Sequence, residues 1–199
     1  MTDTAALTQD MMLDLLFRGA RTHNAWTDRP VTDETIRAIY DLAKWGPTTA
    51  NSNPGRFLFI RSAAAKARLK PHLSAGNVEK AMQAPCTVVI AGDTRFYEFY
   101  DKLFPSRDMR ATFEGNDALI ADAMERSSTL QGAYFMMAAR ALGLDCGPMS
   151  GFDKTGTDAE FFPDGRWKSN FLCNIGYGDP AGLYPRNPRL DFEDACLDL

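Results

Sequence analysis

The chain has 199 residues, of which 45% are hydrophobic and 24% are charged, and its formal net charge is −4. These values are typical of a globular domain and exclude a disordered or fibrous class. Lys and Arg form no concentrated run, which argues against a nucleic-acid or anionic-membrane surface, because such binding depends on clustered positive charge. We expect one domain over residues 1–199, with small molecules or proteins as its partners.

Metal and disulfide chemistry are not indicated. The four cysteines lie far apart, and the only histidines are His23 and His72. This spacing lacks the close ligand pairs of a zinc site and the pattern of a small disulfide scaffold, so we predict no bound metal. Residues 1–6 carry no basic region followed by an apolar run, and no stretch holds about 18 uninterrupted apolar residues. We therefore expect a cytoplasmic protein without a membrane segment.

The first half of the chain is predicted to contain two pairs of helices, each followed by a strand. We expect Asp10 to cap a first helix that ends near Gly19, and a second helix to begin at Thr32 or Asp33. Apolar runs and helical periodicity then predict a strand at 57–60, helices at 62–69 and 74–82, and a central strand at 86–91.

The second half is dominated by a long helix at 117–142, with Gly143 in the position of a C-terminal cap. Its centre, 133–139, is apolar all round, which is typical of a core helix or a dimer interface. The aromatic segment 94–113 forms either a mobile lid or a peripheral part of the core, and the core interpretation is favoured. The remaining expected elements are a loop at 147–153, a short helical stretch at 158–162, a strand at 170–175 and an irregular tail.

One polar loop, Trp45 to Phe57, joins the second helix to the first strand. Its two prolines make it stiff, since proline fixes φ and restricts the residue before it. Taken alone, the loop is ordinary turn chemistry, because Asn, Ser, Thr and Gly are common turn residues. A binding edge is the alternative.

The sequence lacks the usual side-chain constellations of catalysis. Gly176-Tyr177-Gly178-Asp179-Pro180-Ala181 formally fits a dinucleotide fingerprint, but Pro180 and Pro185 oppose the helix that should follow it. No Walker loop, nucleophile elbow or nucleophilic Cys/His pairing is present. An enzyme built this way would take its reactivity from an organic cofactor.

Several short segments could hold such a cofactor. Arg21 and Thr22 form a cation-plus-hydroxyl pair suited to phosphate, and Arg186 and Arg189 add positive charge. Each arginine alone is more typical of an ordinary surface.

Two further segments suit a heterocyclic ring. Asn77 and Lys80 share one helix face, so an amide and an ammonium could bind a carbonyl edge. Residues 148–151 offer a flat apolar pair and backbone amides. Alone, this segment too is more typical of a turn.

Taken together, these segments resemble the FMN-dependent nitroreductase family over nearly the whole chain. The motifs that carry the resemblance are Arg21-Thr22, Pro47-Thr48-Thr49-Ala50-Asn51, Asn77-x-x-Lys80, Gly147-Pro148-x-x-Gly151 and Arg186. The stretches 20–24, 44–48, 147–153 and 174–179 are more narrowly similar to the family branch of malonic semialdehyde (3-hydroxypropanoate-forming) reductases of pyrimidine breakdown.

The resemblance implies an α+β fold, a central antiparallel sheet flanked by helices, and an intertwined homodimer with two FMN sites at the subunit interface. It assigns FMN phosphate binding to Arg21, Thr22 and Arg186. The segments that it places at the flavin ring are Asn77 with Lys80, and Pro148, Met149, Ser150 and Gly151. It also implies that Pro47, Thr48, Thr49 and Asn51 reach the flavin of the partner subunit.

The sequence departs from the family pattern at three positions. Asn24 stands where many relatives have a second basic residue, and Tyr184 where some have lysine, so phosphate binding is expected to depend more on Arg186 and Arg189. Ser150 replaces a glutamate that lies near the nicotinamide in many nitroreductases.

The implied activity is ping-pong hydride transfer from NAD(P)H through tightly bound FMN to a small organic acceptor. No protein side chain is expected to do the chemistry, although Lys80 is a candidate to stabilise charge on the reduced ring. Malonic semialdehyde is the favoured acceptor. The alternatives are a broad nitroaromatic or quinone reductase, a non-catalytic flavin-binding protein and a structural dimerisation module.

Overall fold

The structure is a computed structural model that describes residues 8–199. Residues 1–7, on which the expectation about the N-terminal region rested, lie outside the described part. The first helix, α1 (Gln9–Leu13), continues into a π-helical turn, η1 (Asp14–Arg18), and ends at Gly19 as expected. The predicted cap was wrong: the Thr8 hydroxyl accepts a hydrogen bond from the Met11 amide at 3.2 Å. Asp10 instead lies in the first turn, where it pairs with Arg18.

Four antiparallel strands form the sheet, in the order β1-β2-β4-β3. They are β1 (Gly55–Ile60), β2 (Cys86–Asp93), β3 (Asp145–Met149) and β4 (Trp167–Gly176). β2 is buried along its whole length, which confirms its predicted central position. β3 was missed because Gly147 and Pro148 discourage a strand. It is an edge strand, which pairs on one side only and can therefore accommodate proline.

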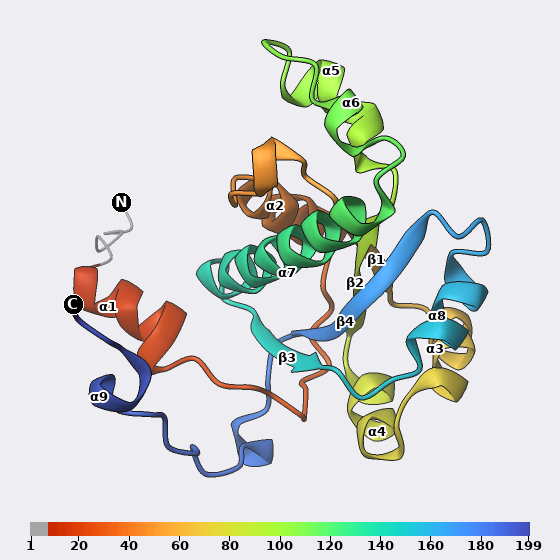
Figure 1. Cartoon of the computed structure of the whole chain (residues 1–199). Coiled ribbons are helices and arrows are strands. Elements are labelled where there is room, and N and C mark those ends of the chain that lie inside the picture. The colour runs from red at the N-terminus through yellow and green to blue at the C-terminus, as the bar shows by residue number, and fades with distance from the viewer. Residues whose placement is uncertain (1–7) are drawn as a thin grey trace, which may run out of the picture.

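Helices cover both faces of the sheet (Figure 1). On one face α2 (Asp33–Ala43) and α7 (Asp117–Ala141) pack on Val88 and Ile90 of β2. On the other face α3 (Ala63–Leu69), α4 (Ala75–Gln83) and α8 (Lys154–Phe161) lie over Val89 and Ala91. Alternate residues of one strand thus supply two cores. This three-layer arrangement confirms the predicted α+β fold with a central antiparallel sheet.

Capping residues lie at several helix ends, at the positions that the sequence predicts for those ends. Thr32 caps α2 and Ser62 caps α3, each through a side chain that accepts a backbone N–H. Gly143 follows α7 with a φ of +79°, as a C-terminal cap requires. The fully buried ring of Phe135 in α7 stacks on Phe57 of β1 with centroids 5.1 Å apart. α7 is therefore anchored to the sheet at its middle.

The aromatic segment 94–113 folds into three short helices, η4 (Phe96–Phe99), α5 (Tyr100–Leu103) and α6 (Arg110–Phe113). Phe96, Tyr100 and Phe113 are buried together against the start of α7. This packing matches the peripheral-core interpretation rather than a loose lid.

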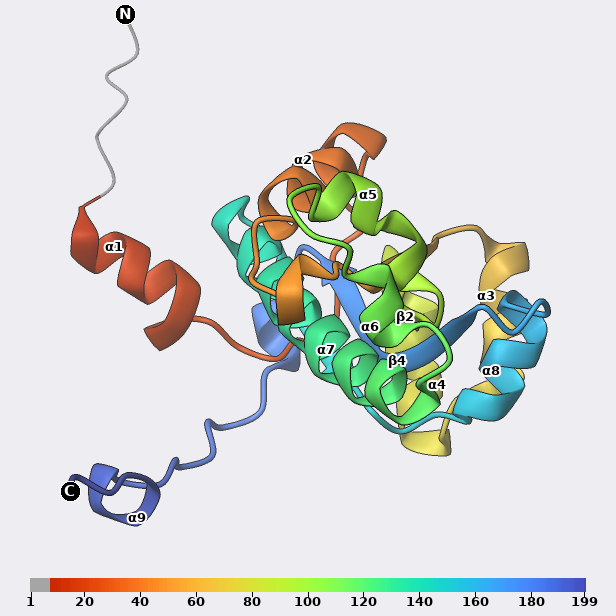
Figure 2. The same ribbon diagram turned by 45° about the horizontal axis from the view of Figure 1, so that its top comes forward.

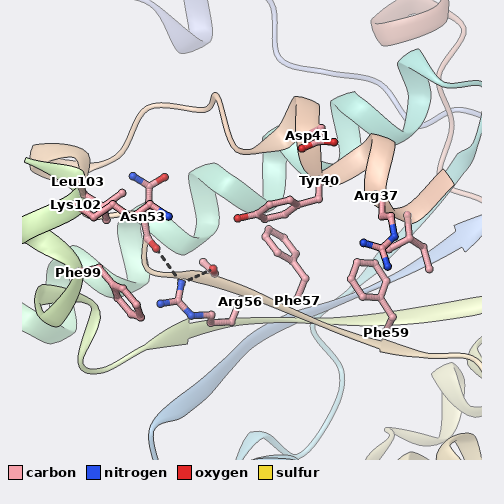
Figure 3. Close-up of a pocket in the computed structure, with 12 residues that line it drawn as sticks. Arg37, Tyr40, Asp41, Asn53, Arg56, Phe57, Phe59, Phe99, Lys102 and Leu103 are labelled. Atoms are coloured by element: carbon pink, nitrogen blue, oxygen red, sulfur yellow. Dashed lines mark hydrogen bonds between the residues drawn. The ribbon is translucent and has the colours of Figure 1, made fainter. Parts of the chain in front are cut away.

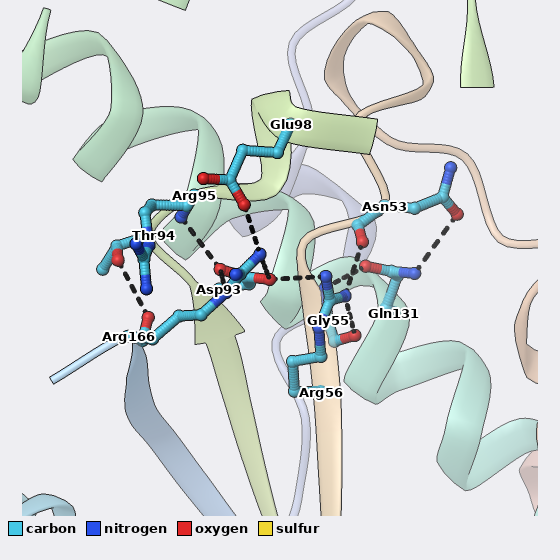
Figure 4. Close-up of polar contacts among 9 residues, drawn as sticks. All are labelled: Asn53, Gly55, Arg56, Asp93, Thr94, Arg95, Glu98, Gln131 and Arg166. Atoms are coloured by element: carbon cyan, nitrogen blue, oxygen red, sulfur yellow. Dashed lines mark hydrogen bonds and ion pairs between the residues drawn. The ribbon is translucent and has the colours of Figure 1, made fainter. Parts of the chain in front are cut away.

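A buried carboxylate joins this aromatic segment to the sheet (Figure 4). The side chain of Asp93, at the end of β2, is 1% exposed and contacts Arg56 at 2.7 Å and Arg166 at 2.9 Å. Arg166 also pairs with Glu98 of η4 at 2.9 Å. The hydrogen bond to Asp93 raises the pKa of the Arg166 guanidinium. Two guanidinium groups on one carboxylate satisfy a charge that would otherwise be costly to bury.

Both ends of the described chain extend from the body on the same side (Figure 2). α1 contains no buried residue, and the tail from Tyr184, which includes α9 (Phe192–Ala195), is exposed throughout. No helix within residues 8–199 is both long and apolar enough to cross a membrane.

Replacing the buried carboxylate should destabilise the fold. Asp93→Asn leaves the partly buried Arg56 guanidinium without its counter-charge and leaves Arg166 with Glu98 alone, so we expect a loss of about 3 kcal/mol in unfolding free energy, measured by urea denaturation. The matched control is Asp122→Asn, which breaks the exposed i,i+4 pair with Arg126 and should cost less than about 1 kcal/mol. Equal losses in the two variants would contradict the assigned role of Asp93.

Candidate functional site

A cavity of about 390 Å³ lies between the segment after α1, helix α4, the C-terminal end of α7 and the tail. We call it the arginine cavity. It is lined by Ala20, Arg21, Thr22, Asn24, Lys80, Arg140, Tyr184, Pro185, Arg186, Asn187 and Arg189. The structure thus brings together six of the predicted cofactor-binding residues, which are Arg21, Thr22, Asn24, Lys80, Arg186 and Arg189.

The arginine cavity is strongly positive. Five cationic side chains line it, and no Asp or Glu is among its lining residues. Within residues 8–199 none of these five cations forms an ion pair. Convergent positive charge of this kind attracts an anionic group, and guanidinium groups bind phosphate well.

Two arginines connect the segment after α1 to the tail. Arg21 donates from Nη2 to the carbonyl oxygen of Tyr184. Arg186 donates in the opposite direction, from Nη2 to the carbonyl oxygens of Arg18 at 2.8 Å and Ala20 at 2.9 Å. The tail is therefore held against residues 18–21 by hydrogen bonds to neutral carbonyl groups, which leave the positive charges uncompensated.

The segment that carries Arg21 and Thr22 is fixed to the sheet by the next residue. The backbone N–H of His23 donates to Cys146 of β3 at 3.0 Å, and its Nε2 lies 3.2 Å from Asp145. The other oxygen of Asp145 accepts from the Gly178 backbone at 2.9 Å. A Cβ at position 178 would collide with the His23 ring, so this glycine is required for packing. That contact gives Gly178 a structural role.

The residues predicted to bind the flavin ring lie next to the arginine cavity. Helix α4 connects the two regions, because it carries both Asn77 and Lys80. Asn77 donates from Nδ2 to the carbonyl oxygen of Gly151 at 3.0 Å, so the helix and the segment after β3 are in direct contact. Pro148 and Met149 belong to β3 itself, and Ser150 follows it at an exposed position. The Lys80 ammonium lines the cavity one turn after Asn77.

Helix α4 is fixed at its C-terminal end by Lys66, whose ammonium donates to the carbonyl oxygens of Met82, at 3.0 Å, and Ala84. Burial lowers the pKa of Lys66. The carbonyl oxygen of Lys80 accepts from Asn174 of β4 at 3.2 Å. These contacts fix the direction in which α4 presents its side chains.

The polar loop after α2 lies elsewhere in the chain. Its Thr49 backbone donates to the buried Ser127 hydroxyl of α7 at 3.1 Å, and Asn51 donates to the Leu103 carbonyl of α5 at 2.8 Å. Thr48 accepts from a backbone amide within the loop, and Pro47 is exposed. None of these four residues lines the arginine cavity. Ser127 and Arg140 lie roughly 20 Å apart along α7, at about 1.5 Å per residue.

Backbone strain is concentrated in this loop. Ala50, Asn51 and Asn53 have φ values of +48°, +52° and +43°, and within residues 8–199 they are the only non-glycine residues with positive φ. Asparagine tolerates this region, but alanine pays a steric cost. Strained residues persist where the surrounding structure holds them, and they cluster at functional sites. The positive φ values at non-glycine residues distinguish this loop from the other connections within residues 8–199.

A second cavity, of about 630 Å³, lies between α2, the edge strand β1 and the aromatic segment (Figure 3). Tyr40, Phe57, Phe59 and Phe99 supply its apolar side chains, and Arg37 points toward Phe59 at one end of the group. This cavity was not predicted, because its lining comes from segments with ordinary core patterns.

Arg140 of α7 was also missed. It lies in the last turn of a helix that was interpreted only through its apolar centre. A basic residue there is typical of a favourable contact with the helix dipole, which gave no reason to single it out.

Similarities in sequence and in fold relate this chain to known proteins. The nitroreductase family model matches residues 17–177, and the chain belongs to this family. A protein of Rhodopseudomonas palustris (strain TIE-1), provisionally named NADH dehydrogenase/NAD(P)H nitroreductase, is 66% identical over 190 residues, covering 96% of this chain and 97% of the relative.

Two solved structures show the same fold. A nitroreductase-type protein of Exiguobacterium sibiricum, solved in complex with FMN, superposes with a TM-score of 0.82 at 24% identity, over 94% of this chain and 97% of that one. An NAD(P)H:FMN oxidoreductase-type protein of Staphylococcus epidermidis gives a TM-score of 0.84 at 19% identity, over 94% and 95% of the two chains. The match extends over almost the whole fold.

Proposed function

We propose that the protein is an FMN-dependent NAD(P)H oxidoreductase whose arginine cavity binds the phosphate of FMN. The observation that carries this proposal is the set of five cations without carboxylate partners, one of which, Lys80, lies one helical turn after Asn77 on α4. A phosphomonoester carries about −1.5 to −2 charges at neutral pH and offers several acceptor oxygens. The residues present therefore fit the anionic end of this cofactor.

Each group of residues has a distinct role in this proposal. Arg21, Thr22, Asn24, Arg186 and Arg189 hold the phosphate. The residues that hold and orient the ring are Asn77, Lys80, Pro148, Met149, Ser150 and Gly151. Bound FMN supplies hydride transfer between NAD(P)H and an organic acceptor. The Lys80 ammonium stabilises negative charge on the ring, because a fixed cation costs no reorganisation when charge develops.

Two related proteins support FMN as the cofactor and NAD(P)H as the reductant. The Rhodopseudomonas palustris relative is named for NAD(P)H-dependent activity, and the Exiguobacterium sibiricum structure contains FMN. A protein that only stores flavin is a weaker alternative, since it has no use for the reductant in the name of a 66% identical relative.

The working form in this proposal is a homodimer in which the strained loop completes the partner's site. Within one chain the loop is fixed to α5 and α7, and it does not line the arginine cavity. Large apolar side chains stay exposed on several elements, as expected of a surface that a second copy covers. They include Met11, Met12, Phe17, Tyr40, Leu42, Trp45, Tyr134, Leu190 and Phe192.

For the acceptor we propose malonic semialdehyde, reduced to 3-hydroxypropanoate. The support is the similarity of residues 20–24, 44–48, 147–153 and 174–179 to that branch of the family. Reduction of nitroaromatic compounds or quinones is the second candidate, and the nitroreductase name of the Rhodopseudomonas palustris relative favours it.

The purified protein should be yellow, and its FMN should bleach when NAD(P)H is added.

Arg21→Gln removes one charge-assisted contact, so we expect the FMN dissociation constant to rise about tenfold to hundredfold, measured by fluorescence titration. Arg126→Gln, on the exposed face of α7, is the control and should leave binding unchanged. A colourless protein that takes up no added FMN would disprove the proposal.

The trans role of the loop can be tested with mixed dimers. One subunit carries Arg21→Gln and the other carries Thr48→Ala with Asn51→Ala. If the loop acts in trans, each mixed dimer contains one site with both lesions and one site with neither, so half of the FMN capacity returns at wild-type affinity. If the loop acts within its own chain, every site has one lesion and no wild-type binding returns.

Steady-state rates distinguish the two acceptor classes. We expect kcat/KM for malonic semialdehyde to exceed the value for a simple nitroaromatic compound by at least about tenfold, measured with NADH and with NADPH. A ratio in the opposite direction would assign the protein to the broad reductases and leave the FMN proposal intact.

A further inference from the structure

Arg140 has an unusual environment for a residue at a helix end. Its Nε is buried and has no hydrogen-bond partner within residues 8–199, whereas Nη1 donates to the Leu16 carbonyl oxygen at 3.3 Å. A buried donor without an acceptor costs about 1–3 kcal/mol, so such groups call for an explanation.

The position of Arg140 supplies an explanation for its unpaired Nε. The residue lines the arginine cavity together with Arg21, Lys80 and Arg186, and no carboxylate is within ion-pair distance of it in the described part of the chain. A contact with the α7 dipole would account for the charge at the helix end. It does not account for a guanidinium donor that has lost water and gained no acceptor.

We propose that Arg140 is an additional phosphate-binding residue, whose guanidinium donates to the anion that the arginine cavity receives. This inference rests on the proposed FMN function and extends it by a residue from the core helix. Arg21 and Arg186 come from the two segments at the ends of the chain, whereas Arg140 comes from α7, which Phe135 anchors to the sheet. Arg140 therefore provides a rigidly placed donor.

Nη1 of Arg140 donates a hydrogen bond to the carbonyl oxygen of Leu16, which belongs to η1. The same guanidinium therefore connects the proposed phosphate site to η1. Arg186 makes an equivalent link, through the carbonyl oxygens of Arg18 and Ala20. Two cations of the cavity thus hold consecutive parts of one N-terminal segment.

The test compares FMN with riboflavin, which has the same ring and ribityl chain but no phosphate. For Arg140→Gln we expect the FMN dissociation constant to rise about tenfold to hundredfold, while riboflavin binding changes by less than about twofold. Arg140→Lys keeps the charge but loses the planar fork, so its loss for FMN should be intermediate. Arg126→Gln, on the same helix and paired with Asp122, should alter neither ligand.

Either of two results of this comparison would overturn the inference. FMN binding of Arg140→Gln within twofold of the wild type would show that the phosphate does not use this residue. Equal losses for FMN and riboflavin would show a purely structural role.

A measurement with inorganic phosphate separates this inference from the proposed function. Millimolar phosphate should raise the Tm of the wild-type protein more than that of Arg140→Gln. If the wild type binds no flavin but shows this difference, the FMN proposal fails and the anion-binding role of Arg140 stands. If phosphate shifts both proteins equally, the role of Arg140 fails, whatever the flavin result.

Discussion

The central constraint on this molecule is that five like charges surround one cavity whose lining residues include no carboxylate to neutralise them. Mutual repulsion makes this arrangement costly for the unliganded chain. The fold maintains it by using neutral carbonyl groups as partners: Arg21 binds Tyr184, Arg186 binds Arg18 and Ala20, and Arg140 binds Leu16. Each guanidinium is thereby oriented while its charge stays available. A carboxylate would orient the side chains equally well and would cancel the field that attracts a phosphate.

The long helix α7 relates the two halves of the proposed site. Its Ser127 holds the strained loop, its Phe135 anchors the helix on the sheet, and its Arg140 lines the arginine cavity. One rigid element therefore fixes the separation between the phosphate-binding residues and the loop. In the proposed dimer, α7 therefore positions both the phosphate-binding residues of its own subunit and the loop that completes the partner's site.

The sequence predicted features that are set by neighbouring residues. The helix start at Thr32 or Asp33, the helix from residue 62, the buried strand at 86–91 and the glycine after α7 all depend on local chemistry, and the structure confirms them. Other features needed tertiary information. Edge-strand pairing lets Pro148 lie in β3, and the left-handed conformation of Ala50 depends on contacts of its loop with α5 and α7. Arg140 is recognisable as a candidate site residue only in the folded chain, because residues 21 and 186 are distant in sequence and line the same cavity. The resemblance to the nitroreductase family identified most of the proposed site, because it compares distant segments that periodicity treats separately.

The hydrogen bonds of Arg140 and Arg186 to residues 16–20 have a consequence for the lifetime of the protein. Both ends of the described chain adjoin segments that line the arginine cavity, and both extend from the body largely exposed. An anion bound there holds the roots of both ends at once, and a ligand that binds only the ordered state stabilises it by mass action. The ends of a chain are also where proteolysis usually starts. Susceptibility to cellular proteases should therefore follow cofactor supply, so that molecules left without their anion are degraded first.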